Sequence, residues 1–431
     1  SRGVPFVTMR SWYAVAKSRQ LPVSICPVYL RMTFEALAKG SGNQEIATTM
    51  AFVRLVKDLM RDPETGRRWV PIVPDEARTF GMESLFPGNG IYSPVGQAYD
   101  PVDRDMLLYY KEATNGQILH EGITEAGSMA DFTAAATAYA THGEPMIPFY
   151  IFYAMFGWQR TADQMWALAD QLGRGFLIGA TAGRTTMTGE GVQHADGHSH
   201  LIASTNPAAV SYDPAFAYEL AVIVRDGLRR MYGPHAEDVF YYLTVYNEPK
   251  IQPAMPAGVE EGIVKGLYRF RTADLAEAPR LQLLASGTAI HWALDAQRLL
   301  ASDWGVAADV WSATSWTELR RDALSCDAAA LKGEDRVPYV TRVLDGEPGP
   351  VLAVSDWMRA VPDQIAQWVP QDWHSIGTDG FGLSDTREAT RRHFGVDPES
   401  IAVAALAALA RRGEIKPETV REARERYGLD D

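Results

Sequence analysis

Cysteine, long apolar runs and clustered basic charge are all scarce in this sequence of 431 residues. Its two cysteines, Cys26 and Cys326, lie far apart, so no disulfide framework is expected and a reducing cytoplasm is predicted. No apolar run approaches the ~20 residues of a membrane span, and no secretory signal pattern is seen near the first residue. The 54 acidic residues outnumber the 41 basic ones, which argues against nucleic acid or an anionic membrane as the main partner.

The composition is that of a globular protein with more than one core. Hydrophobic residues make up 46% and charged residues 22% of the chain, which excludes a disordered polymer. The length is about twice what one core supports, so two domains are expected. Strand-like apolar runs alternate with helix-like segments, which predicts an α/β protein with mainly parallel sheets. The proline-rich stretch 249–258 marks the predicted boundary, and the poorly periodic residues 1–31 are interpreted as an arm.

Two acids follow the predicted strand 69–73. Asp75 and Glu76 stand at its carboxyl end, where open α/β sheets place their ligands. Adjacent residues on a turn point in different directions. The sequence therefore favours one functional acid and one structural cap over a paired acid and base.

Glu125 falls in the first turn of an alanine-rich helix that Thr124 can cap. The residues themselves leave two interpretations open, an ordinary helix acid stabilised by the helix dipole or a functional carboxylate. The aromatic residues of the segment 149–158 are, by pattern alone, mostly core.

A histidine-rich cluster ends the long glycine- and threonine-rich loop 181–200. His194, Asp196, His198 and His200 lie close enough in sequence to supply metal ligands, as in a metal-dependent hydrolase. The loop context and the lack of an obvious remote ligand weigh against that role. A histidine that acts as acid, base or hydrogen-bond donor, or one that only holds the loop, remains possible at each position.

Six segments resemble the pyruvate dehydrogenase decarboxylating component. The similarity is to the homodimeric type within the thiamine diphosphate-dependent transketolase superfamily. The segments are QILHEGITEAG (117–127), MIPFYIFYAMFGWQR (146–160), GRTTMTGEGVQHADGHSH (183–200), SYDPAFAYE (211–219), PDEARTFGM (74–82) and GTDGFGLSD (377–385). The resemblance implies two three-layer α/β/α domains: a pyrimidine-binding domain at 32–254 and a transketolase-like C-terminal domain at 255–431.

The resemblance also implies roles for individual residues around the aminopyrimidine ring of thiamine diphosphate. Glu125 matches the glutamate that bonds a ring nitrogen of the cofactor. Phe156 matches an aromatic residue that packs on the ring, Tyr153 a polar aromatic near its amino group, and Ile123 a part of the neighbouring wall. His194 matches an active-site histidine that contacts substrate or moves protons.

Further implications concern the acids and the last matching segment. Asp75 and Glu76 match acids that line the same channel. The segment GTDGFGLSD is expected to be structural or to lie at a dimer contact rather than to be catalytic.

One element of the superfamily pattern is missing from the sequence. Relatives hold the diphosphate and its Mg²⁺ with a Gly-Asp-Gly motif in a separate domain, and no Gly-Asp-Gly occurs here. The resemblance therefore implies a partner that carries the diphosphate-binding domain and most of the magnesium ligands. Either this chain is one subunit of a split enzyme, a dimer or heterotetramer, or it is a piece of a longer protein; the split subunit is the favoured prediction.

The resemblance implies decarboxylation of a 2-oxo acid, with pyruvate favoured, and transfer of the acyl group or activated aldehyde to an acceptor such as the lipoyl arm of an acyltransferase. Carboligation or transketolase-like transfer of the activated aldehyde is an alternative within catalysis. From other classes, a non-catalytic assembly subunit and a metal-dependent hydrolase built on residues 194–200 remain open.

Overall fold

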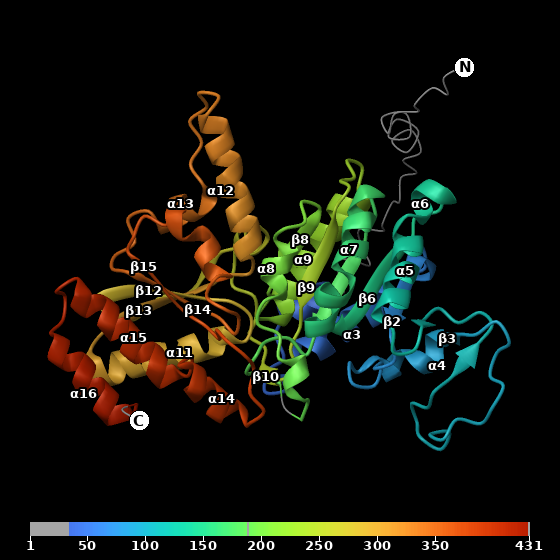
Figure 1. Ribbon diagram of the computed structural model, residues 1–431, viewed down its shortest axis with the longest axis horizontal. Helices are drawn as coiled ribbons and strands as arrows, with labels where there is room; N and C mark the ends of the chain where they lie inside the picture. Colours follow the sequence, from blue (N-terminus) through green and yellow to red (C-terminus); the bar gives the residue numbers. More distant parts are fainter. Residues whose placement is uncertain (1–33, 188, 430–431) are drawn as a thin grey trace.

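Two separate β-sheets organise the chain, as a computed structural model of residues 34–187 and 189–429 shows (Figure 1). The first sheet has six strands, all parallel, in the order β5-β2-β6-β7-β9-β8. Its strands are β2 (Trp69–Val73), β5 (Leu119–His120), β6 (Ile147–Tyr153), β7 (Phe176–Ala180), β8 (Ala209–Tyr212) and β9 (Phe240–Thr244). Because helices cover both faces, the central strands are almost continuously apolar and buried.

Side chains of the first sheet alternate between two helical layers. Phe149 and Ile151 of β6 join the core formed with α3 (Thr48–Leu59) and α9 (Ala217–Tyr232). Tyr150 and Phe152 of the same strand point to the other face and join a second core. That second core is formed with α5 (Glu125–Ala136), α7 (Ala154–Asp170) and α8 (Ser199–Ala203). This part of the chain is therefore a three-layer α/β/α unit.

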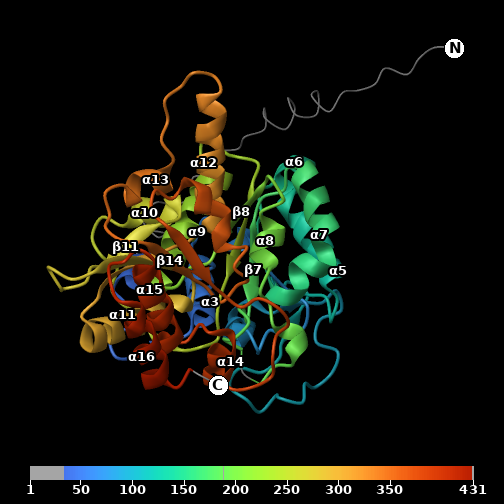
Figure 2. The same ribbon diagram turned by 60° about the vertical axis from the view of Figure 1, so that its left-hand side comes forward.

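The second sheet has five strands in the order β11-β13-β12-β14-β15, with only β11 antiparallel to its neighbour. Its helices again lie on both faces, and α12 extends well beyond the sheet (Figure 2). The elements are β11 (Tyr268–Arg271), β12 (Arg280–Ala285), α11 (Ala289–Trp304), β13 (Ala307–Ser312), α12 (Trp316–Ala330), α13 (Tyr339–Leu344), β14 (Val351–Val354), β15 (Trp373–Ile376), α14 (Arg387–Phe394), α15 (Pro398–Arg411) and α16 (Pro417–Tyr427). The prediction of two α/β domains with mainly parallel sheets is confirmed.

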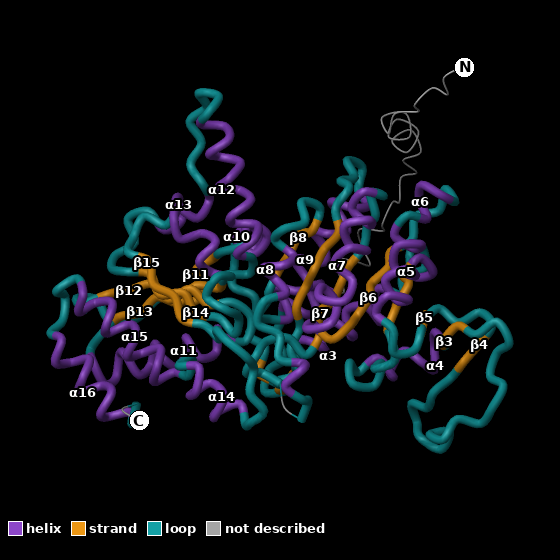
Figure 3. The backbone as a smooth tube through the Cα atoms, viewed as in Figure 1, coloured by secondary structure: helices purple, strands orange, loops and turns teal. Residues whose placement is uncertain are grey.

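Shorter elements connect and flank the sheets (Figure 3). They are β1 (Glu45–Ile46), β3 (Ile91–Tyr92), β4 (Glu112–Ala113), β10 (Lys250–Ile251), α4 (Phe86–Asn89), α6 (Ala138–Thr141), α10 (Glu260–Lys265) and the 3₁₀ turns η1 (Gly66–Arg68), η2 (Met82–Leu85), η3 (Val192–His194) and η4 (Pro362–Trp368). The predicted arm, residues 1–31, lies outside the described residues, and the domain division after residue 254 stays a prediction.

Buried polar contacts join the two units. Glu219 on α9 is fully buried and accepts hydrogen bonds from the hydroxyl groups of Tyr268 (2.6 Å) and Ser312 (2.6 Å) in the second sheet. Glu248, just after β9, forms an ion pair with Arg391 of α14. One apolar core also continues from the first unit into the second. Across residues 34–187 and 189–429, no helix has the length and apolar character needed to cross a membrane.

Candidate active site

Glu125 is the first residue of α5 and lies at the carboxyl edge of the first sheet. The helix starts there because the Thr124 side chain accepts a hydrogen bond from the Gly127 backbone N–H at 3.2 Å. Glu125 is only 7% exposed, and the helix N-terminus favours its negative charge. The structure thus holds a carboxylate in a sheltered position at the end of the sheet where α/β proteins bind ligands.

The Glu125 carboxylate has one cationic partner. Arg160, on α7, donates from Nη1 to Glu125 Oε1 at 2.7 Å. The same guanidinium lies 3.9 Å from the centre of the Phe156 ring. The Arg160 side chain is 50% exposed, so it can leave this position without unfolding its surroundings. Glu125 and Phe156 together therefore accommodate a planar group that donates N–H bonds.

The rings of Tyr153, Phe156 and His194 pack together beside Glu125. Tyr153 is the last residue of β6, and α7 begins at the next residue, Ala154. Phe156 therefore lies in the first turn of α7. The His194 ring lies 4.5 Å from the Tyr153 ring and 4.9 Å from the Phe156 ring, centre to centre. The structure thus brings together four predicted site residues from three separate segments of the sequence.

The imidazole of His194 is held in a partly buried position. Burial lowers its pKa, and the nearby charges of Glu190 and Glu76 only partly oppose that effect. The ring is therefore neutral at pH 7. Its buried Nδ1 atom makes no well-aligned hydrogen bond among the described residues, although the Gly191 backbone lies near enough to the imidazole to raise its pKa.

Asp75 and Glu76 have different side-chain contacts, and Glu76 Oε2 accepts the Asp75 backbone N–H at 3.0 Å. Asp75 Oδ1 lies 3.0 Å from His120 Nε2, on the adjacent strand β5. Burial raises the pKa of Tyr153, and the charge of Glu76 adds to that increase. Glu76 therefore acts electrostatically on the ring cluster, whereas Asp75 is engaged with His120.

Ile123 is 76% exposed, two residues before α5. Its predicted place in the wall beside the cofactor stays a prediction, because the described part of the chain does not cover its side chain.

The histidine-rich loop does not converge on one point. His200 is buried and bonds to Ser211 Oγ (2.6 Å) and Thr244 Oγ1 (2.9 Å). His198 Nε2 lies 2.5 Å from the Gln159 amide nitrogen. Asp196 Oδ1 accepts the backbone N–H groups of His198 and Ser199, where α8 begins. Over the described ranges 34–187 and 189–429, no three His, Cys, Asp or Glu side chains group as metal ligands would, so the metal-dependent hydrolase has no ligand set there.

Comparison with known families accounts for both units of the fold. Residues 26–253 match the pyruvate dehydrogenase E1 component middle domain, and residues 266–397 match the transketolase-like C-terminal domain. The chain belongs to the pyruvate dehydrogenase E1 component family. The pyruvate dehydrogenase E1 component of Mycolicibacterium smegmatis is 59% identical over 403 residues, which cover 93% of this chain and 43% of that protein. The Escherichia coli K12 protein of the same name is 50% identical over 90% of this chain and 44% of its own length.

This E1-family chain thus spans less than half the length of the curated relatives it matches. Solved structures support the fold alone. Transketolase from Leishmania mexicana aligns over 94% of this chain and 50% of its own length, with a TM-score of 0.65 and 15% identity. A split-gene transketolase described as an inactive β4 tetramer aligns over 85% of this chain and 98% of its own, with a TM-score of 0.53 and 16% identity.

Arg160 is a part of the site that the sequence pattern did not indicate. The helix α7 begins at Ala154, before Phe156. Phe156 and Arg160 therefore lie one helical turn apart on the same face, which is the spacing at which side chains meet. A sequence prediction that starts the helix before Phe156 would place Phe156 and Arg160 on one face and so identify this pair.

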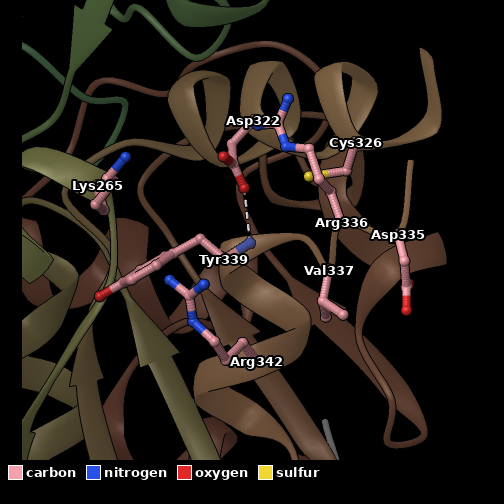
Figure 4. A pocket seen from close by; sticks show the side chains of 8 residues that line it. All are labelled: Lys265, Asp322, Cys326, Asp335, Arg336, Val337, Tyr339 and Arg342. Atoms are coloured by element: carbon pink, nitrogen blue, oxygen red, sulfur yellow. Dashed lines mark hydrogen bonds between the residues drawn. The ribbon is translucent and has the colours of Figure 1, made fainter. Parts of the chain in front are cut away.

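A separate cavity lies in the second unit of this E1-family chain, at the base of α12 (Figure 4). Its volume is about 440 Å³, and the Asp322 carboxylate in it accepts the Tyr339 backbone N–H at 2.6 Å. None of the predicted site residues lines it. The lining residues are Lys265, Asp322, Cys326, Asp335, Arg336, Val337, Tyr339 and Arg342.

Proposed function

We propose that this chain supplies the aminopyrimidine half of a thiamine diphosphate site and, with a diphosphate-binding domain, decarboxylates pyruvate or a related 2-oxo acid. The observation that carries the proposal is the sheltered Glu125 carboxylate beside the rings of Tyr153, Phe156 and His194. Membership of the pyruvate dehydrogenase E1 component family supports it.

The residues present fit the aminopyrimidine part of the cofactor. The contacts of Arg160 support this fit, because its flat guanidinium lies over Phe156 and donates to Glu125. An aminopyrimidine is likewise flat and carries N–H donors when its ring nitrogen shares a proton. Glu125, Phe156 and Tyr153 are the residues that would hold it, with Ile123 beside them.

Thiamine diphosphate, when bound, supplies the electron sink for the electrons that the departing carboxylate leaves behind. The chain contributes position and charge. Glu125 would share a proton with a ring nitrogen of the bound cofactor, which a carboxylate does effectively only where water is excluded. The 7% exposure of Glu125 meets that condition.

His194 is the candidate partner of the substrate. Burial lowers the pKa of its imidazole, so at pH 7 it offers one N–H donor and one lone pair. A neutral imidazole can donate to a substrate carboxylate or carbonyl oxygen and can accept a proton during acyl transfer. Glu76 supplies negative charge beside it, and Asp75 Oδ1 lies 3.0 Å from His120 Nε2.

The remaining parts of the machinery belong to the proposal as well. The diphosphate and Mg²⁺ would be held mainly by a diphosphate-binding domain, either on a partner chain in a dimer or heterotetramer or in another part of the same protein. The split-gene transketolase supports the first arrangement, because this fold aligns with 98% of its length. A lipoyl arm would take the acyl group, and the cytoplasm would be the location.

A graft tests the proposal even while the partner is unidentified. In the graft, this chain replaces the stretch of the Mycolicibacterium smegmatis E1 component that it matches. The assay measures the pyruvate-dependent reduction of an artificial electron acceptor. The graft should turn over, and Glu125→Gln should lower kcat about 10²-fold or more, since it removes the proton-sharing carboxylate. Glu121→Gln, an exposed acid four residues before Glu125, is the matched control and should retain activity.

A folded graft without turnover contradicts the proposal. Retained turnover in Glu125→Gln would instead indicate the non-catalytic assembly subunit. Analysis of the products formed from pyruvate and an added aldehyde separates oxidative decarboxylation from carboligation.

A further inference from the structure

The loop that carries His194 is fixed on both sides by the second unit. It leaves β7 after Ala180 and reaches α8 at Ser199. Because the backbone of Gly191, in the same loop, interacts with the His194 imidazole, the course of the loop backbone and the packing on Tyr153 and Phe156 set the orientation of the ring. What holds the loop therefore holds the histidine.

Asp356 holds the part of the loop before His194. It follows β14 of the second sheet and is completely buried. Its carboxylate accepts hydrogen bonds from the Thr185 backbone N–H (3.0 Å), the Thr185 hydroxyl (2.9 Å) and the Thr186 hydroxyl (2.6 Å). Three donors that converge on one buried carboxylate make a strong and directional anchor.

Gly183 allows this close approach. Its φ angle is +85°, and a Cβ atom there would lie 2.2 Å from Asp356 Oδ2. No side chain larger than hydrogen fits between the loop and the carboxylate. The backbone is thus shaped for this contact.

Arg184 ties the loop to the segment after β15. Its Nη1 donates to the carbonyl oxygens of Thr378 and Gly380, within GTDGFGLSD. Its guanidinium also lies against Gly197, where a Cβ atom would be 2.3 Å from Cζ. The part of the loop after His194 is fixed as well, because the Met358 backbone N–H donates to the Gly197 carbonyl at 2.8 Å.

We propose that Asp356 and Arg184 are positioning residues for His194, through which the C-terminal unit sets the geometry of the active site. The proposal rests on the proposed function only in taking His194 as a residue of that site. The proposal also assigns a role to the segment GTDGFGLSD, because the carbonyl groups of Thr378 and Gly380 in that segment accept hydrogen bonds from Arg184. It also gives a reason why the site needs both units.

The test follows the His194 ring itself. The chain is labelled with ¹³C at the histidine Cε1 position, and His194→Gln assigns the signal among the nine histidines. Thr186→Val removes one donor to Asp356 at constant shape, and Thr186→Ser keeps it. Arg184→Met removes the contacts to Thr378 and Gly380. Asp363→Asn, an exposed acid on η4, is the control.

Thr186→Val and Arg184→Met should move the His194 signal and its titration midpoint, while Thr186→Ser and Asp363→Asn should not. In the grafted enzyme, the two disruptive variants should lower kcat about 10-fold to 100-fold, the range expected from a misplaced group. Circular dichroism checks that each variant is folded. If Arg184→Met does not fold, the test relies on Thr186→Val.

An unchanged His194 signal in folded Thr186→Val overturns the positioning role. Turnover of the His194→Gln graft at the parental rate contradicts the proposed function of His194 instead, so the two failures are distinguishable.

Discussion

The buried Glu248 carboxylate, paired with Arg391 and Lys250, should contribute about 3 kcal/mol to the stability of the two-unit structure. The Glu248 and Arg391 side chains are each 9% exposed, and the shorter contact between them is 2.5 Å. Burial alone would raise the pKa of Glu248, but Arg391 and Lys250 outweigh burial and lower it to about 2. A decrease from the ordinary glutamate value of 4.5 corresponds to roughly 3 kcal/mol at ~1.4 kcal/mol per pH unit.

The pH dependence has a definite sign. Because the pKa is lower in the folded protein, the contribution is fully present above about pH 4.5 and is lost as the pH falls towards 2. At pH 7, Glu248→Gln should therefore lower the free energy of unfolding by about 3 kcal/mol. Arg391→Met should do the same or more, moderated by Lys250, which keeps a contact of 2.8 Å to Glu248.

Urea unfolding at pH 7, followed by tryptophan fluorescence, measures both changes. The double variant should cost much less than the two single changes together, because it leaves no unpaired buried charge. The control is Glu260→Gln, which breaks an exposed pair between Arg225 and Glu260 and should cost about 0.5 kcal/mol or less. Equal effects of Glu248→Gln and Glu260→Gln would show that burial adds nothing to the Glu248 pair.

Two further predictions follow from individual residues. His291 should titrate near pH 4 by NMR, because burial and the charge of Lys250 lower its pKa to about 4; an unshifted midpoint near 6.5 would show that its surroundings are wet. Gly183→Ala should destabilise the protein by about 1 kcal/mol or more beyond Gly189→Ala. Both glycines have φ near +85°, but a Cβ meets Asp356 only at position 183; equal melting temperatures for the two variants would contradict the close approach.

Local sequence patterns were enough to predict the elements that position the site residues. The strand before Asp75 was predicted with its observed bounds, and Thr124 was identified as the cap before Glu125. These features depend on apolar runs and capping chemistry that short windows of sequence contain.

Features that depend on contacts between distant parts of the sequence could not be predicted from local patterns. His194, His198 and His200 are close in sequence, yet three different sets of neighbours turn them apart. Asp356 and Thr186 are 170 positions apart, so no local pattern indicates their bond. The fold could be predicted from the sequence, whereas the hydrogen bonds that hold the loop required the packed structure.

Calorimetric titration of thiamine diphosphate with Mg²⁺ asks whether this chain carries the aminopyrimidine half of the site. The titration is made into the chain alone and into the grafted enzyme. We expect weak binding to the chain alone, tight binding to the graft, and a loss of affinity in the Glu125→Gln graft. Tight binding to the chain alone, or binding to the graft that Glu125→Gln leaves unchanged, would contradict the assignment of Glu125 and of this half-site.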